Sequence, residues 1–352
     1  MMRLNNISRV KRLMDSAISD LSLDLQGISV LTEAASGAFV VTPLIAALAG
    51  AEKVFAVTRN SRYGSAKEVA TYVEEWAYTL KVLDRICVTT RPAYEYAHQV
   101  QLVTNLGFVR PINAQLVERL PPHSAIALMW ETWEYRSEDV DLMACREHGI
   151  PVLGTCETHP RLRIFRYVGM LALKLLLEAN IEVFRSRILL IGSGHFGLET
   201  KEVLVTNGCD VLHIDPKNKW EPQDLLIGEY MRQADAVVLV EHQEKFSLLG
   251  GVTGLPLDWF HPNNPIIIHI CGHIDNTEIQ EHKLCKLPDS EVLPGFMAVT
   301  TDYVGPRPVI DLHTAGLKVG EALIRGLQKY THLDEAIKFA LNNSPAMNFA
   351  QS

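Results

Sequence analysis

The sequence has few of the features that mark membrane, secreted or nucleic-acid-binding proteins. Its most apolar helical stretch, 164–177, contains Arg166 and Lys174 and is too short to span a bilayer. The first twenty residues carry positive charge but no apolar core, so we expect neither a signal peptide nor a membrane anchor. The formal net charge is −8 and the basic residues are dispersed. We therefore expect no nucleic-acid partner and no membrane partner.

Paired cysteines are also lacking. The six cysteines form no CxxC motif, and most fall inside predicted strands or helices, which is typical of reduced thiols in a cytoplasmic protein. His269, Cys271 and His273 occupy alternate positions, which a strand would direct to one side. A strand end beside a cofactor explains the same residues, and we expect no metal site.

What the chain does have is length and an alternating pattern. Its 352 residues, 47% of them hydrophobic, are enough for two domains with sizeable cores. Strand and helix patterns alternate before residue 163, which predicts an α/β domain with a parallel sheet. Strands are expected at 28–31, 53–57, 85–89, 101–104, 125–129 and 151–154, and helices at 40–48, 66–80, 113–119 and 137–148.

The pattern continues to the end of the chain. Apolar residues at helical spacing predict a helix over 163–179. After Asp215, strands are expected near 236–240, 266–270 and 297–300, followed by helices at about 317–330 and 333–341.

The strongest functional signal lies in segment 187–215. An apolar strand enters a glycine-rich turn, a helix pattern follows, and a second strand ends at Asp215. Glycines in this pattern permit a tight turn, close approach to a pyrophosphate, and close packing of helix on strand. We therefore predict a dinucleotide-binding βαβ unit. The predicted cofactor contacts are Gly192, Ser193, Gly194, His195, Phe196, Gly197, Asp215, Pro216 and Cys271.

Asp215 indicates which dinucleotide is preferred. It follows the glycines at close to the spacing of about 20 residues that is typical of a ribose-binding acid. A carboxylate there accepts a hydrogen bond from the ribose 2′-OH of NAD and repels the 2′-phosphate of NADP. Lys217 and Lys219 would soften that repulsion. NAD is the predicted cofactor, with NADP less favoured.

Charged and polar residues follow the predicted strands of the first domain. Ligands of open parallel sheets gather at the carboxyl ends of the strands, so these residues are candidates for substrate contact. Arginine binds carboxylate or phosphate groups bidentately, which favours a small anionic substrate. The predicted substrate contacts are Glu33, Arg59, Arg62, Tyr63, Asn105, Arg110 and Glu131.

The order of these motifs resembles the D-2-hydroxyacid dehydrogenase family. The resemblance is carried by GSGHFG with Asp215, by segment 266–275, and by IDLHTAG at 310–316. It implies an α/β fold with two domains, a Rossmann-type doubly wound parallel sheet and a flavodoxin-like substrate domain. The substrate domain would comprise 1–163 and 317–352, and the NAD-binding domain 164–316. A short stretch, 30–51, is also similar to S-adenosylhomocysteine hydrolase and alanine dehydrogenase.

The same resemblance implies a catalytic group and an oligomeric state. On the match to the family's final segment, His313 would be the general acid/base, placed before the return helix. Asp302 is the candidate to orient it. Cys271 stands where the family has the arginine that binds the substrate carboxylate. Families of this architecture usually form homodimers, and we expect one here.

These observations predict an NAD-dependent oxidoreductase that acts on a small polar, anionic substrate by hydride transfer. Two alternatives remain open. One is an enzyme that retains NAD and oxidises its substrate only transiently, as a hydrolase or lyase of this fold would. The other is a non-catalytic NAD-binding regulatory protein, because the missing arginine weakens the case for catalysis.

Overall fold

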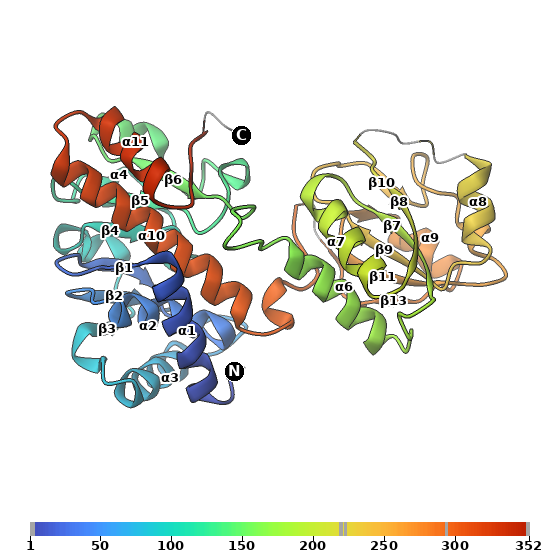
Figure 1. Cartoon of the computed structure of the whole chain (residues 1–352), viewed down its shortest axis with the longest axis horizontal. Helices are drawn as coiled ribbons and strands as arrows, with labels where there is room; N and C mark the ends of the chain where they lie inside the picture. Colours follow the sequence, from blue (N-terminus) through green and yellow to red (C-terminus); the bar gives the residue numbers. More distant parts are fainter. Residues whose placement is uncertain (1–3, 218–220, 222–223, 293–294, 350–352) are drawn as a thin grey trace. The chain divides into compact units, whose positions relative to one another are not determined.

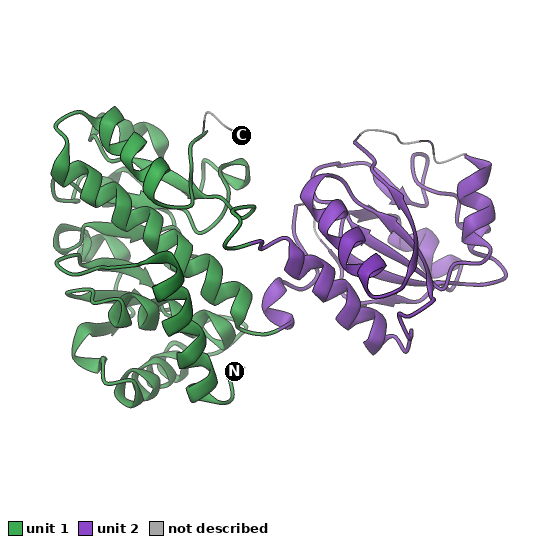
Figure 2. Ribbon diagram, viewed as in Figure 1, with its two compact units in different colours: residues 1–162, 305–352 green, residues 163–304 purple. Residues whose placement is uncertain are grey.

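The chain divides into two α/β units, which Figure 2 colours separately. Unit 1 comprises residues 1–162 and 305–352, and unit 2 comprises residues 163–304. The computed structural model describes residues 4–217, 221, 224–292 and 295–349. Sequence analysis placed the return to the first domain at residue 317. The chain in fact returns at Gly305, because the whole of helix α10 (Arg307–Lys329) belongs to unit 1.

The sheet of unit 1 has the order β14-β6-β5-β4-β1-β2-β3 (Figure 1). All its pairings are parallel except that of β14 with β6. The parallel strands are short and largely buried, as expected for a sheet covered on both faces. Their bounds are β1 Val30–Glu33, β2 Val54–Val57, β3 Ile86–Thr89, β4 Leu102–Thr104, β5 Ala125–Ala127, β6 Val152–Thr155 and β14 Ala346–Met347.

Helices cover both faces of this sheet. One face packs against α1 (Ile7–Leu21), α2 (Val41–Leu48), α3 (Ala66–Thr79) and α10. The other face packs against α4 (Ala114–Val117) and α5 (Leu142–Glu147). Helix α11 (Leu333–Asn343) packs on α10 and leads into β14. The six strands and four helices predicted before residue 163 are confirmed, although α5 is shorter than expected.

Helix α10 corrects the expectation for the segment 310–316. Small residues there suggested a break before the return helix, but the segment lies inside α10. A Cβ on Gly316 would overlap the sulfur of Met129, and one on Gly320 would overlap the side chain of Leu102. The glycines therefore serve close packing of the helix on the sheet rather than a helix stop.

The main sheet of unit 2 is parallel, in the order β13-β11-β9-β7-β8. One face carries α6 and α7, and the other carries α8 and α9. A separate pairing joins β10 to β12. The bounds are α6 Arg166–Glu178, β7 Arg187–Ile191, α7 Gly194–Thr206, β8 Asp210–Ile214, α8 Leu225–Met231, β9 Ala236–Val240, β10 Ser247–Leu249, β11 Ile266–Cys271, β12 His273–Ile274, α9 Asn276–Glu281 and β13 Lys286–Leu287.

The strand orders fix where a ligand would bind each unit. In unit 1 the chain moves from β1 to β2 on one side and later to β4 on the other. In unit 2 it moves from β7 to β8 and then to β9. Ligands of such sheets bind outside the carboxyl ends at these reversal points. The doubly wound α/β class is thus confirmed. The order β3-β2-β1-β4-β5-β6 in unit 1, predicted as flavodoxin-like, is that of a classic Rossmann sheet, and the order β8-β7-β9-β11-β13 in unit 2 is the flavodoxin-like variant of the doubly wound sheet.

Two further expectations concern single segments. Residues 297–300 were expected to form a strand, but the structure gives them only an isolated bridge between Cys271 and Met297 and a bond from Ala298 N–H to the Ile270 carbonyl. These residues therefore do not form a strand with a continuous ladder of backbone hydrogen bonds. None of the described helices is long and apolar enough to cross a membrane.

Candidate functional site

The glycine turn of unit 2 lies at its strand-order reversal. Strand β7 ends at Ile191, and α7 begins at Gly194. A Cβ on Gly192 would meet the Val240 side chain on β9 at 2.5 Å. A Cβ on Gly197 would collide with the carbonyl oxygen of Gly192. Gly194 differs from both, because its φ is +55° and a Cβ there would meet no atom within 4 Å. Two glycines therefore serve close packing, and the third faces open space.

The start of α7 is suited to an anionic group. Ser193 is its N-cap residue, but the Ser193 side chain makes no capping hydrogen bond. Among the described residues the fully buried Ser193 hydroxyl has no hydrogen-bond partner. The N-terminus of a helix carries partial positive charge and free N–H groups, which makes it a binding site for phosphate. The residues present therefore fit a dinucleotide.

Asp215 and Pro216 follow β8 beside this turn. Ile214 pairs with Ile191, and Gly192 N–H donates to the Ile214 carbonyl oxygen at 3.1 Å, so Asp215 lies one residue beyond the paired strand ends. The Asp215 carboxylate is partly exposed and accepts the N–H of Lys217 at 3.0 Å. Pro216 is buried. Lys219 lies outside the described residues.

Sequence analysis did not single out Glu241 and His242, which follow β9. The Glu241 carboxylate is fully buried and accepts the N–H of Ser193 at 2.8 Å. The His242 ring stacks on Phe196 with ring centroids 3.9 Å apart, and burial lowers the pKa of His242 to about 4. His195 stacks on Phe165 with centroids 5.7 Å apart. The position of Glu241 directly after a buried strand is the signal in the sequence that could have identified it.

Cys271 ends the neighbouring strand, β11. Its side chain is buried, and burial together with the charge of Glu241 raises the pKa of the thiol. His269 is also buried, its Nε2 bonds the carbonyl oxygen of Gly272 at 2.8 Å, and its pKa is lowered to about 4 by burial. Cys271 therefore provides a neutral thiol at physiological pH.

In unit 1, four of the predicted substrate contacts gather around the loop that follows β4. Glu33, at the end of β1, accepts Phe108 N–H at 3.0 Å, and Arg59 donates to the Phe108 carbonyl at 3.0 Å. The buried Asn105 accepts Met129 N–H at 2.8 Å. Arg110 forms an ion pair with Asp139 at 2.5 Å. These bonds hold the loop at the reversal point between β1 and β4.

Some polar atoms in this region have no partner among the described residues. They are Nδ2 of Asn105, Nε of Arg110 and the hydroxyl of Thr58, which follows β2. Burial raises the pKa of Glu33, although the Phe108 N–H and the charge of Arg110 oppose that rise. Buried donors without partners are costly unless a ligand or water satisfies them. The loop therefore offers hydrogen-bond donors to an acceptor-rich ligand.

The other predicted substrate residues lie elsewhere in unit 1. Arg62 and Tyr63 occupy an exposed turn closed by Ser61 and Gly64, where the Arg62 guanidinium lies 4.7 Å from the centroid of the Tyr63 ring. Glu131 is buried, accepting Trp133 Nε1–H at 2.8 Å and Glu157 N–H at 2.9 Å. These contacts stabilise the local loops.

The histidine singled out by the sequence, His313, is 4% exposed on α10. Its Nδ1 lies 2.6 Å from the Thr42 hydroxyl on α2, and its ring lies 5.8 Å from that of Phe39. Burial lowers the pKa of His313 to about 4, so the ring is neutral at pH 7. The observed partner is therefore Thr42. Asp302, in unit 2, instead accepts a hydrogen bond from Thr300.

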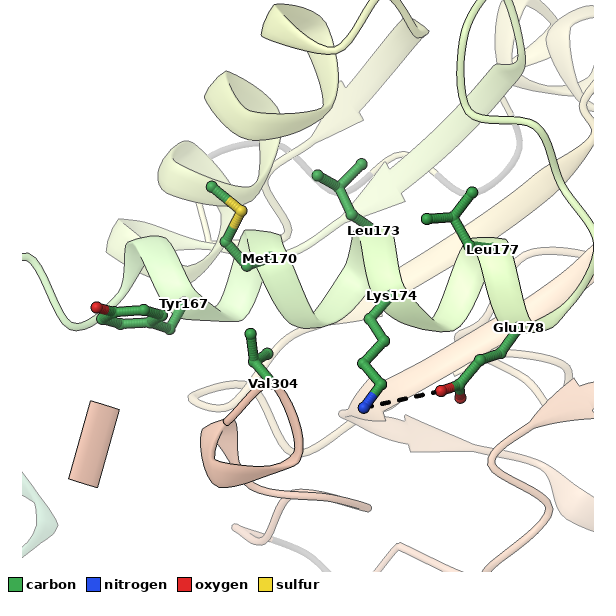
Figure 3. A pocket seen from close by; sticks show the side chains of 7 residues that line it. All are labelled: Tyr167, Met170, Leu173, Lys174, Leu177, Glu178 and Val304. Carbon is green, nitrogen blue, oxygen red and sulfur yellow. Dashed lines mark ion pairs between the residues drawn. The ribbon is translucent and has the colours of Figure 1, made fainter. Parts of the chain in front are cut away.

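An apolar depression of about 650 Å³ lies along α6 in unit 2 (Figure 3). Met170, Leu173 and Leu177 line it from the helix, and Val304 lines it from the facing segment. Its only charged residues are Lys174 and Glu178, which lie 3.9 Å apart. The depression has few polar groups to orient a substrate, so it is a poor candidate for the reaction site.

Comparison with proteins of known structure identifies folds similar to that of this chain. No family model matches the chain, and the curated proteins searched include no match. The dipicolinate synthase A subunit of Bacillus halodurans is 11% identical, with a TM-score of 0.52 over 86% of this chain and 99% of that chain. The A chain from Bacillus subtilis is 10% identical, with a TM-score of 0.51 over 88% and 98%. A pyruvate reductase of Chlamydomonas reinhardtii gives a TM-score of 0.45 at 13% identity, covering 87% and 98%. The two structures with TM-scores above 0.5 show the fold alone: the chain shares the α/β fold of the dipicolinate synthase A subunits.

Proposed function

We propose that unit 2 binds NAD and that the protein is an NAD-dependent oxidoreductase acting on a small anionic molecule. The observation that carries this proposal is the glycine turn at the strand-order reversal of unit 2. Gly192 and Gly197 pack where no side chain fits, and Gly194 leaves space beside the N-terminus of α7. This division of roles is what close approach of a pyrophosphate requires.

Each cofactor residue has a stated task in the proposal. When bound, NAD supplies the group that accepts or donates hydride. The first turn of α7 holds the pyrophosphate through backbone N–H groups, and the missing side chain of Gly194 lets the backbone come close. Asp215, partly exposed after β8, accepts a hydrogen bond from a ribose hydroxyl.

The cofactor preference is tested by titrating the purified protein with NAD and NADP. We expect NAD to bind more tightly than NADP, and Asp215→Ala to weaken NAD binding roughly 10- to 100-fold, since a hydrogen bond to a charged group contributes about 1.5–3 kcal/mol. Calorimetry gives both Kd values. Asp258→Asn, which removes a charge from an exposed position in the same unit, is the matched control. Absence of binding by either nucleotide would overturn the cofactor proposal, and equal Kd values would overturn only the preference for NAD.

Substrate binding is proposed for unit 1. The loop after β4 presents Asn105 Nδ2 and Arg110 Nε without partners in the described part of the chain, and Arg59 contributes a further cation. Donors of this kind match a carboxylate or phosphate. Glu33 adds a carboxyl group whose pKa is raised by burial.

His313 is the proposed proton-transfer group. Its depressed pKa keeps it neutral, and a proton on Nδ1, shared with the Thr42 oxygen, would leave Nε2 to accept a proton from substrate. With a verified substrate, His313→Gln is expected to lower kcat by about 10²- to 10⁴-fold while the Kd for NAD stays unchanged. Circular dichroism and urea denaturation check that the buried substitution is tolerated. Unimpaired turnover by a folded His313→Gln protein would rule out this role.

A non-catalytic NAD-binding protein is the second candidate, and Cys271 favours it. A buried thiol stands where the resemblance leads us to expect a carboxylate-binding arginine. This candidate predicts NAD binding without hydride transfer to any substrate, and no effect of changing Glu131 or Arg62 on NAD affinity. Native mass spectrometry adds a third outcome, because NAD retained through purification would favour an enzyme that oxidises its substrate transiently.

The homodimer remains part of the proposal. The apolar side chains along α6 include Leu177, which is 59% exposed, and they form a surface that a second copy would cover. The subunit count from the same native mass spectra tests this expectation.

A further inference from the structure

Glu241 is the least expected charge in unit 2. It directly follows β9, at the strand-order reversal, and its carboxylate has no exposed surface. One carboxylate oxygen accepts Ser193 N–H at 2.8 Å. The other accepts the N–H groups of Gln243 at 2.7 Å and Glu244 at 3.0 Å. The carboxylate therefore ties the glycine turn after β7 to the loop after β9.

The loop after β9 lies near a cation, because Lys217 bonds Oε1 of Gln243 at 3.4 Å and its charge helps to lower the pKa of His242, but Lys217 does not form an ion pair with Glu241. Of the residues that the structure describes, none forms an ion pair with it, and its hydrogen bonds come from backbone N–H groups. The adjacent imidazole of His242 has a pKa lowered to about 4 by burial, so that ring is neutral at pH 7. On the β11 side, Cys271 is held as a neutral thiol partly by the same carboxylate. A buried carboxylate, held by backbone N–H groups, therefore lies at the base of the reversal point.

The strand order indicates which half of a dinucleotide faces this charge. Asp215 lies after β8, so the adenosine ribose belongs on that side of the turn. The pyrophosphate belongs at the start of α7, after β7. The nicotinamide half must then extend to the other side, toward the ends of β9 and β11, where Glu241 and Cys271 lie.

We propose that Glu241 makes the dinucleotide site of unit 2 discriminate between the two redox states of the cofactor, holding NAD⁺ more tightly than NADH. The inference rests on the proposed function. NAD⁺ carries a positive charge on its nicotinamide ring and NADH does not, whereas the rest of the molecule is the same. Repulsion between Glu241 and the phosphates is therefore common to both forms and cancels in the ratio of their Kd values. Attraction to the oxidised ring does not cancel.

The test compares Kd for NADH with Kd for NAD⁺, and it needs no substrate. Calorimetric titrations are made on the wild type, Glu241→Gln, and Glu229→Gln, which removes a charge from an exposed position on α8. A unit charge acting over about 10 Å at an effective dielectric constant near 20 changes affinity roughly tenfold. We expect the Kd ratio to fall by about that factor in Glu241→Gln and to stay unchanged in Glu229→Gln.

The possible results separate the two proposals. If neither nucleotide binds the wild type, the proposed function fails. If both bind and the ratio is the same in Glu241→Gln, the role of Glu241 is overturned while NAD binding stands. The side-chain amide introduced by Glu241→Gln cannot accept all three backbone N–H groups, and this variant risks misfolding. If the variant does not fold, the two Kd values of the wild type decide. Tighter binding of NAD⁺ than of NADH supports the proposal, and equal or tighter binding of NADH overturns it.

Discussion

Gly197→Ala is expected to abolish dinucleotide binding by unit 2 and to lower the free energy of unfolding by about 3 kcal/mol. A Cβ there would collide with the carbonyl oxygen of Gly192 and would lie 2.7 Å from Nε2 of His213. The His213 ring bonds the same carbonyl oxygen at 2.8 Å, so it cannot withdraw without losing that contact. The start of α7 would have to move away from β7, and the N–H groups that face the pyrophosphate would move with it.

Gly194→Ala provides the contrast. Its Cβ would meet no atom within 4 Å, but its φ of +55° is a left-handed conformation that costs an alanine about 1–2 kcal/mol. We expect a small loss of stability and at least a tenfold loss of NAD affinity, because the new methyl group enters the space proposed for the cofactor. Urea denaturation and calorimetry measure the two effects separately.

Gly149→Ala is the matched control for backbone strain. Gly149 has a φ of +66°, lies in unit 1, and has no atom within 4 Å of the position that a Cβ would occupy. It should show the same small loss of stability with no change in NAD affinity. If Gly194→Ala bound NAD as tightly as the wild type, the open side of the turn would not be the side that the cofactor approaches.

The glycine turn also shows what the sequence can predict. Segment 187–215 is local, and its strand, turn, helix and second strand follow from apolar runs and from glycines at fixed spacing. The six buried strands of the first domain follow in the same way. Helix α1 was also readable, because Val10, Leu13, Met14, Ala17 and Leu21 are buried at helical spacing, although we did not predict it.

Features that depend on tertiary contacts were not predictable. Gly316 was placed before the return helix, and its role in close packing is evident only when α10 is seen against Met129. The hydrogen bond between Thr42 and His313 joins residues 271 positions apart in the sequence. Strand order is likewise set by packing, which is why the Rossmann order of unit 1 emerged only in the structure.

The second large effect expected is a loss of stability of unit 1 as the pH rises through 7. Two carboxyl groups contribute to it, those of Glu134 and Glu157, and the carboxylate of Glu131 acts on both. Glu131, at the start of η5 (Thr132–Glu134), holds the Trp133 indole and the Glu157 backbone. Burial, and to a lesser extent the charge of Glu131, raises the pKa of Glu134 to about 7. Burial and the charges of Glu134 and Glu131 raise the pKa of Glu157.

The direction follows from proton linkage. A carboxyl group whose pKa is higher in the folded than in the unfolded protein stabilises the fold below its unfolded pKa, about 4.5 here, and loses that contribution as the pH rises through its folded pKa. For Glu134 the window is therefore pH 4.5 to about 7. Each such proton changes the free energy of unfolding by up to about 1.4 kcal/mol per pH unit. His313 acts in the opposite direction between pH 6.5 and about 4, because its pKa is lowered in the folded state.

Comparing variants with the wild type separates the contribution of the carboxyl groups to the pH dependence of stability from that of His313. Glu134→Gln is expected to gain on the order of 2 kcal/mol relative to the wild type between pH 5 and pH 8, because an amide of the same shape needs no proton. Glu157→Gln should also become more stable relative to the wild type as the pH rises, because burial and the charges of Glu134 and Glu131 raise the pKa of Glu157. Glu138→Gln, an exposed glutamate in the same loop, is the control and should follow the wild type at every pH. Urea denaturation at intervals across this range measures the differences.

Parallel curves for Glu134→Gln and the wild type would mean that Glu134 is already ionised in the folded protein. The partly buried carboxylate of Glu134 would then be stabilised by a cation or water that offsets the charge of Glu131.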